Sequence, residues 1–232
     1  MRCIRLKRSV RCLAILFMLT SNALAGKMTF ELKGTGGNMA GSEWIAAEGE
    51  ITADSASDLE NYLNTNWNFA KQKIRYDVNL NSPGGSLIGG IKLGEFFHKY
   101  NFNTYVAKTV PDGYGHSTTA SGLCASACAI AFIGGIERHT EGGDLGIHQF
   151  YQEMSLKNPS EKIFDALDMS SQQMVSAILI GYTFRMGVDP RFIAIASATP
   201  PTLSLYPLLN GTGNFCKGTG KLNARTGNLN RI

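Results

Sequence analysis

The sequence predicts an α/β domain, in which strands alternate with helices. Short stretches with alternating apolar residues, typical of strands, are followed along the chain by longer stretches with apolar residues on one side, typical of helices. Turns rich in glycine, serine and proline separate these stretches. The sequence contains no internal repeat and no obvious linker. We therefore expect one folded domain.

The first half of the chain predicts six elements. Asp54 or Ser55 suits the start of a helix, because a short polar side chain can accept a hydrogen bond from a free N–H of the first turn. The alternation of Tyr76, Val78 and Leu80 predicts a strand. The expected strands are Met28–Lys33, Glu43–Ile51, Arg75–Asn81 and Asn103–Lys108, and the expected helices are 54–71 and Ser86–Tyr100.

The second half continues the alternation. The segment Pro111–Gly122 is polar and predicts a loop that could shape or cover a pocket. Asp189 followed by Pro190 predicts a helix start, with the aspartate as the cap and the proline at the first helical position. The expected helices are Ser126–Ile133, a stretch after Pro159 to about Met186, and one that begins at Asp189-Pro190; the expected strands are Ile136–His139 and Asp144–Phe150.

The N-terminus predicts a cleaved export signal. Five basic residues precede the apolar run Cys12–Leu19, and Ala23-Leu24-Ala25 fits the small-x-small cleavage rule. The run is far shorter than the roughly 20 residues that span a bilayer. We expect a signal peptide at 1–25, an α/β domain at 26–209, and a polar extension at 210–232 that is mobile unless Cys216 fixes it. The mature protein would be periplasmic or secreted, without a stable membrane span.

The basic character of the chain belongs to the signal. The full sequence has 22 basic and 18 acidic residues, a net charge of +4. Removing the five basic residues of the signal leaves 17 basic groups against 18 acidic ones, a net charge of −1. The mature chain therefore gives no reason to expect a nucleic-acid partner.

Three segments together supply the parts that acyl-transfer chemistry needs. Asn81-Ser82-Pro83-Gly84-Gly85 offers backbone N–H groups in a turn after a strand, and Cys124-Ala125-Ser126-Ala127-Cys128 offers a serine at the start of a helix. Gly146-Ile147-His148-Gln149-Phe150 offers a histidine at the end of a strand. A serine nucleophile requires a nearby base, and the developing oxyanion requires hydrogen-bond donors.

In this order, these segments resemble the proteolytic subunit of Clp-type serine proteases, within the ClpP/crotonase superfamily. The resemblance covers about Trp44 to Pro207 and implies a spiral of β-β-α units. It implies Ser126 as the nucleophile, His148 as the base, and the N–H groups of Gly85 and Ala127 as oxyanion donors. The alternative for Ser126 is a helix-capping role, which is common for serine.

The sequence departs from this family in its third catalytic residue. The resemblance places an aspartate near Thr199–Pro207, where the sequence has no carboxylate. Asp189 is a candidate, although its fit as a helix cap also explains it. A Thr, Ser or Asn side chain or a backbone carbonyl could hold the imidazole instead. Losing the orienting group of a triad can cost about 10⁴ in kcat, so a slow or silent relative is an alternative.

Three cysteines remain after signal cleavage, and export favours a disulfide. Cys124 and Cys128 lie four apart across a helix start, a spacing that argues against a bridge between them. We expect Cys124–Cys216, because Cys128 falls inside the buried helix pattern. Cys128 as a catalytic thiol in place of Ser126 is an alternative.

The sequence thus predicts an exported ClpP-like serine peptidase that acts on short or unfolded peptides through an acyl-enzyme. The alternatives are a catalytically weak or silent ClpP-fold binding or assembly module, a crotonase-type acyl-thioester enzyme, and a peptidase that pairs Ser126 with Lys92 or Lys108. The sequence has neither a phosphate-binding G-x-x-x-x-G-K-[ST] loop nor a metal motif, so no cofactor is expected. The family often forms rings, so the resemblance implies a homo-oligomer.

Overall fold

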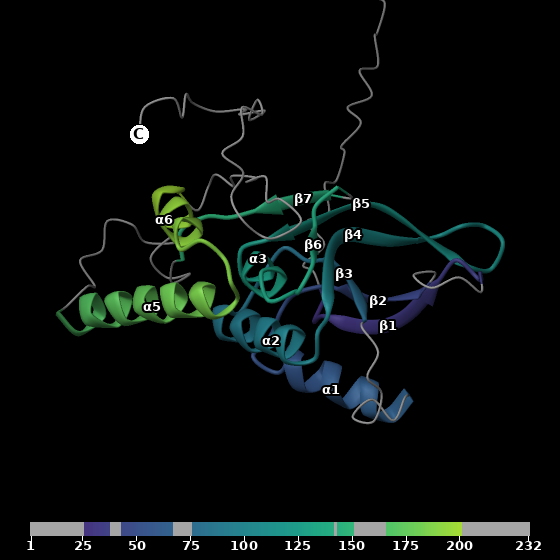
Figure 1. Cartoon of the computed structure of the whole chain (residues 1–232), viewed down its shortest axis with the longest axis horizontal. Helices are drawn as coiled ribbons and strands as arrows, with labels where there is room; N and C mark the ends of the chain where they lie inside the picture. Colours follow the sequence, from purple (N-terminus) through teal and green to yellow (C-terminus); the bar gives the residue numbers. More distant parts are fainter. Residues whose placement is uncertain (1–25, 38–42, 67–75, 142, 151–165, 201–232) are drawn as a thin grey trace, which may run out of the picture.

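A computed structural model describes residues 26–37, 43–66, 76–141, 143–150 and 166–200. These residues form one mixed sheet of seven strands with helices between them (Figure 1), which confirms the predicted α/β class. The strands are β1 (Thr29–Gly34), β2 (Glu43–Glu48), β3 (Asp77–Asn81), β4 (Asn103–Pro111), β5 (Ser117–Ala125), β6 (Arg138–His139) and β7 (Gly143–Gly146). The helices are α1 (Ser55–Asn66), α2 (Leu87–Lys99), α3 (Ala127–Phe132), α5 (Ala166–Arg185) and α6 (Arg191–Ala198).

The sheet runs in the order β1-β2-β3-β4-β5-β7, and β6 pairs with β4. The pairs β2–β3 and β3–β4 are parallel, whereas β1–β2 and β4–β5 are antiparallel. The chain order β-β-α occurs in β1-β2-α1 and again in β4-β5-α3. At its far end, β5 runs parallel both to β7 and to Ser82, which follows β3. The ends of these three segments therefore meet at one edge of the sheet.

One apolar core joins the sheet to the helices. Gly90 and Gly94 allow α2 to pack closely on α3, because a Cβ at Gly90 would lie 2.4 Å from the carbonyl oxygen of Ala127. All six residues of α3 are buried, as their small apolar side chains predict. The largest fully buried side chains include Phe97, Phe102, Phe132, Tyr182 and Phe192.

The structure corrects the prediction of a loop at Pro111–Gly122. Most of this segment belongs to β5, which pairs with β4 from Ala107↔Ser121 to Pro111↔Ser117. This ribbon extends away from the helices in Figure 1. Residues 118–121 are exposed, so neither face needs apolar side chains and the alternation that marks a half-buried strand is missing. Backbone pairing with β4 makes the strand.

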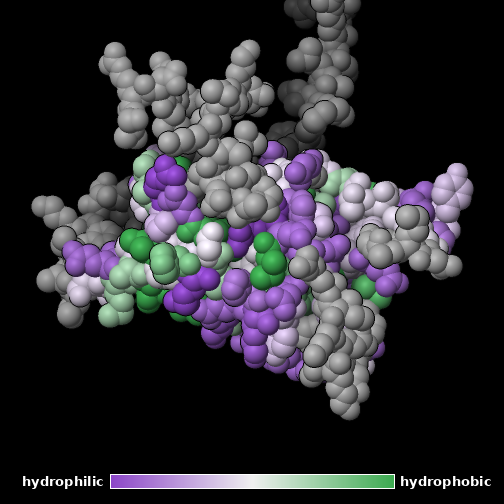
Figure 2. All heavy atoms as spheres, in the orientation of Figure 1, coloured by the Kyte–Doolittle hydropathy of each residue, from purple (hydrophilic) through white to green (hydrophobic). Residues whose placement is uncertain are grey.

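Helix α5 buries Leu179 and Tyr182 but leaves other apolar side chains exposed. Figure 2 shows apolar residues at the surface in the region of α5. The exposed ones are Met174, Ile178, Ile180 and Phe184. Among the described residues, none of the helices combines the length and the apolar character needed to cross a membrane. The predicted signal peptide at 1–25 and the predicted extension at 210–232 lie outside the described residues.

Candidate active site

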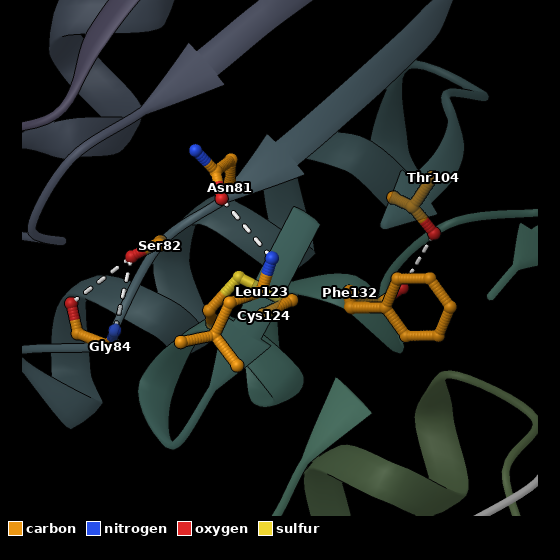
Figure 3. Close-up of a disulfide and its surroundings, with 8 residues drawn as sticks. Asn81, Ser82, Gly84, Thr104, Leu123, Cys124 and Phe132 are labelled. Atoms are coloured by element: carbon orange, nitrogen blue, oxygen red, sulfur yellow. Dashed lines mark hydrogen bonds between the residues drawn. A yellow bond between two sulfur atoms is a disulfide. The ribbon is translucent and has the colours of Figure 1, made fainter. Parts of the chain in front are cut away.

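The turn after β3 is attached to the strand that carries the serine. The N–H of Ser82 donates to the carbonyl of Leu123 at 2.6 Å, and the N–H of Ala125 donates to the carbonyl of Ser82 at 3.0 Å. The side-chain oxygen of Asn81 accepts from the N–H of Leu123 at 3.1 Å (Figure 3). The Asn-Ser pair of the motif thus fixes the Gly-rich turn beside the last residues of β5.

Gly84 brings this turn against the serine. A Cβ at Gly84 would lie 2.7 Å from Ser126 Cβ, closer than real Cβ atoms approach, and 3.2 Å from the backbone nitrogen of Ala127, a tight contact. Gly84 and Gly85 have φ angles of 111° and 129°, which L side chains rarely adopt. The Ser82 hydroxyl accepts from the Gly84 N–H at 3.1 Å and holds the turn (Figure 3). The backbone conformation at both positions therefore favours glycine.

Ser126 forms a sharp corner between β5 and α3. Its φ of 57° and ψ of −120° lie outside the regions that non-glycine residues normally occupy. Such a conformation costs about 1–3 kcal/mol and persists where the surrounding structure imposes it, often at functional sites. Ser126 stands at the N-cap of α3, but its side chain makes no capping hydrogen bond. Helix capping therefore does not explain why serine occupies this corner.

The base candidate lies next to this corner along the backbone. The N–H of Ser126 donates to the carbonyl of Gly146 at 2.9 Å, two residues before His148, and β5 pairs with β7 through Ala125↔Gly146. The fold thus brings the two predicted catalytic segments together from 22 residues apart. A hydrogen bond between the Ser126 hydroxyl and the His148 ring stays a prediction. In enzymes without substrate such a bond is often long, and it tightens when substrate binds.

A backbone carbonyl holds the ring of His148. The Nδ1 atom lies 2.7 Å from the carbonyl oxygen of Gln149. A carbonyl only accepts, so Nδ1 carries the proton, and in the neutral ring Nε2 carries the lone pair that a general base needs. Gln149 is itself fixed at the end of α6, because its N–H donates to the Thr199 carbonyl at 2.8 Å and its Nε2 to the Ser197 carbonyl at 2.9 Å.

The structure corrects the candidacy of Asp189 as the orienting acid. Both oxygens of this carboxylate bind Arg191: Oδ1 accepts from the Arg191 N–H at 2.9 Å, and Oδ2 accepts from the guanidinium. This pairing lowers the pKa of Asp189 and occupies it at the start of α6. Thr199 and Ser197 contact Gln149, the neighbour of His148, through their main-chain carbonyls, and residues 201–207 lie outside the described residues.

The two predicted oxyanion donors are the N–H of Ala127, which follows Ser126, and the N–H of Gly85, which follows the glycine packed against Ser126. Ala127 is the first residue of α3, where a helix leaves its N–H groups without intrahelical partners. In the part of the chain that the structure describes, no hydrogen bond uses the N–H of Gly85 or Ala127. Their role in catalysis stays a prediction.

The predicted disulfide partner of Cys124 was wrong. The structure bonds Cys124 to Cys128, so Cys124 is not paired with Cys216, which lies outside the described residues. The prediction against this pair rested on its separation of four residues across a helix start. The corner at Ser126 folds the chain back and brings the two Cα atoms to 5.1 Å, within disulfide range. Because Cys128 is part of this bond, it has no free thiol. This excludes the alternative in which Cys128 replaces Ser126 as the nucleophile.

The remaining features around the site were less visible in the sequence. A hollow of about 190 Å³ lies beside the His148 segment, and the residues that line it come from that segment, α5 and α6: Gln149, Phe150, Gln172, Val175, Ser176 and Ser197. Its lining mixes amides, hydroxyls and two apolar side chains. Lys92 and Lys108, the alternative partners for Ser126, are both exposed.

Neither a known family model nor a curated protein sequence matches the chain. Several solved structures are similar to it. They include a ClpP1 mutant from Listeria monocytogenes (15% identity, covering 64% of this chain and 75% of that one, TM-score 0.41). Another is the ClpP protease catalytic domain from Plasmodium falciparum (18% identity, 68% and 72%, TM-score 0.41). A third is a mutant of a membrane-bound stomatin-specific protease (14% identity, 68% and 68%, TM-score 0.41).

Proposed function

We propose that this protein is an exported serine peptidase that cleaves short or unfolded peptides through an acyl-enzyme. The observation that carries the proposal is the corner at Ser126. A serine holds a conformation that serine rarely adopts, makes no capping bond, and is tied through its N–H to the strand that leads to His148. An energetically costly backbone at a half-exposed hydroxyl is expected where that hydroxyl reacts.

In the proposed reaction, Ser126 Oγ attacks the peptide carbonyl while His148 Nε2 accepts the hydroxyl proton. The N–H groups of Gly85 and Ala127 stabilise the tetrahedral oxyanion, and each donor of this kind contributes about 10²–10³ in rate. His148 then gives its proton to the leaving amine, which departs with the C-terminal part of the peptide. Water, activated by the same imidazole, hydrolyses the acyl-enzyme and restores the serine.

The partners follow from the same proposal. Peptides that are short or unfolded suit an exported enzyme, because ATP-driven unfolding is an intracellular process. The hollow beside His148 is large enough for one side chain and has a mixed polar and apolar lining. We also propose that the mature chain has no stable membrane span, binds no nucleic acid and forms a homo-oligomer.

The decisive experiment is active-site labelling with a fluorophosphonate probe. We expect the wild-type protein to be labelled at Ser126 and both S126A and H148A to lose labelling by at least about 10³-fold. The matched control is S121A, which removes an exposed serine from the same strand. Labelling of S126A at the wild-type rate would contradict the proposed nucleophile.

A second candidate is a silent ClpP-fold binding module. One observation favours it: the sequence has no carboxylate at Thr199–Pro207, where the resemblance places the orienting aspartate. A folded wild-type protein, judged by circular dichroism, that neither reacts with the probe nor hydrolyses peptides would support this candidate over the peptidase.

A further inference from the structure

The Cys124–Cys128 disulfide encloses the candidate nucleophile. It joins the second-to-last residue of β5 to the second residue of α3, with Ser126 midway between them. Cys124 pairs with Ser82, the first residue after β3, and Figure 3 shows the sulfur bond of Cys124 behind the Leu123 and Cys124 sticks. Four residue steps of extended chain would span about 13 Å. The two Cα atoms are 5.1 Å apart, so the chain must reverse within this segment, and it does so at Ser126.

A link this short acts locally. The entropy that a disulfide removes from the unfolded chain grows with the length of the loop that it closes, and this loop has a sequence separation of only four. Both cysteines are fully buried, as are Ala125 and Ala127, whereas Ser126 is half-exposed. The disulfide therefore closes a buried loop that presents one hydroxyl at the surface.

Besides the disulfide, the backbone of Ser126 is held by hydrogen bonds. One hydrogen bond holds the N–H of Ser126 to Gly146, and another joins the carbonyl of Ser126 to the N–H of Ala129 at 3.0 Å. Helix α3 has only six residues, and no side chain caps its start. Hydrogen bonds tolerate rotation about φ, whereas a covalent link between residues two before and two after the corner restrains it.

Building on the proposed peptidase function, we infer that Cys124 and Cys128 are positioning residues for Ser126. Their bond holds Ser126 in its positive-φ conformation. This sets the direction of Oγ and, through the next peptide unit, of the Ala127 N–H. Without the bond, Ser126 can relax to an ordinary φ, and both groups then turn away from the substrate together. A displacement of about 1 Å at a reacting group can cost about 10² in rate.

The test compares C124A/C128A with the wild-type protein and with C216A. The C216A variant removes the remaining cysteine of the predicted mature chain and leaves this bond intact. The readout is fluorophosphonate labelling of Ser126, resolved into probe affinity and maximal labelling rate. We expect C124A/C128A to label about 10²-fold more slowly at saturation, with unchanged probe affinity and circular dichroism. C216A should match the wild type. A purely structural role would not lower the maximal rate of a folded variant selectively.

Several outcomes would overturn the inference. One is a folded C124A/C128A variant that labels at the wild-type rate, and another is a non-reducing peptide map without a Cys124–Cys128 link. Should the variant fail to fold, wild-type protein is reduced with dithiothreitol in mild denaturant, diluted, and then reoxidised. The labelling rate must fall on reduction and return on reoxidation, and equal rates in both states contradict the inference. A wild-type protein without labelling refutes the proposed function itself, and is thereby distinguished from failure of the positioning role.

Discussion

Gly84 and Ser126 face each other across the candidate site, and each depends on the other. Ser126 can occupy its corner because Gly84 has no Cβ, and the Gly84 backbone can approach because its own φ is positive. A side chain at position 84 would push directly against Ser126 Cβ and the N–H of Ala127. The glycine motif and the serine motif are therefore one packed unit.

We predict that Gly84→Ala lowers the labelling rate of Ser126 by about 10²-fold or more and destabilises the fold by about 1–3 kcal/mol. The matched control is Gly113→Ala, because Gly113 also has a positive φ, 82°, but a Cβ there would meet nothing within 4 Å. The control shows how much of the effect comes from a side chain at positive φ, so the remainder is due to the contact with Ser126. Equal labelling of both variants, measured with urea unfolding alongside, would show that contact with Gly84 is irrelevant.

The segments of the candidate site could be predicted from the sequence, but the backbone conformation that shapes it could not. Ser126 and His148 stand in short motifs whose residue types suit the proposed chemistry, and the fold places their segments side by side. The acceptor for His148 Nδ1 is the carbonyl of Gln149, a group that every residue has. The positive φ of Ser126 also has no signature in the sequence. Because this corner brings Cys124 close to Cys128, the predicted disulfide partner was wrong.

At the scale of elements, α3 is held in place by side chains from elsewhere in the fold. Its six residues are too few to be stable alone. The Tyr182 hydroxyl on α5 donates to the carbonyl of Ile130 at 2.8 Å, and the Thr104 hydroxyl on β4 donates to that of Phe132 at 2.8 Å (Figure 3). Arg138 Nε donates to the carbonyl of Ile133 at 2.9 Å. These bonds satisfy carbonyls that a helix end leaves open.

We predict that Tyr182→Phe lowers the free energy of unfolding by about 1–3 kcal/mol at neutral pH, because the buried Ile130 carbonyl loses its donor. Burial raises the pKa of the Tyr182 phenol above its usual value. The unfolded chain releases this proton near pH 10 while the folded chain keeps it, so wild-type stability falls as the pH rises past about 10.

The difference between Tyr182→Phe and wild type should therefore shrink between about pH 8 and about pH 11, as measured by urea unfolding. Burial also raises the pKa of Tyr76 and Tyr105, but these residues are present in both proteins and cancel in the comparison. A difference that is constant or grows with pH would contradict the assignment.

The positions of most elements could be predicted because apolar spacing reports burial. Helix α2 was expected at Ser86–Tyr100 and spans Leu87–Lys99, and β3 was expected to end at Asn81, where it does end. Two strands differ from the prediction. The strand expected at Asp144–Phe150 is β7, which ends at Gly146, so His148 lies beyond the strand. The other is β5. Its exposed part carries serines and threonines on both faces, and its register is set by its partner β4, which a local pattern does not report.

At the scale of the whole molecule, the disulfide relates the candidate site to the proposed export. Disulfides persist in oxidising compartments and are rare in the cytosol. The bond joins Cys124 to Cys128 on either side of Ser126, and an oxidising compartment would favour its formation. The signal predicted at 1–25 would deliver the chain to such a compartment. One experiment can therefore test both the location of the protein and the state of the disulfide beside Ser126.

We predict that the full chain, expressed in a bacterial host, is cleaved after Ala25 and recovered from the periplasm. N-terminal sequencing should begin at Gly26, and non-reducing peptide mapping should link Cys124 to Cys128. Ala25→Arg should abolish most processing, because signal cleavage requires a small residue there, whereas the control Ala25→Ser should be processed normally. A separate variant that lacks residues 2–25 should stay in the cytosol, hold Cys124 and Cys128 as thiols and react slowly with the probe. Wild-type protein that keeps Met1, stays in the cytosol and still labels rapidly would separate export from activity and contradict this link.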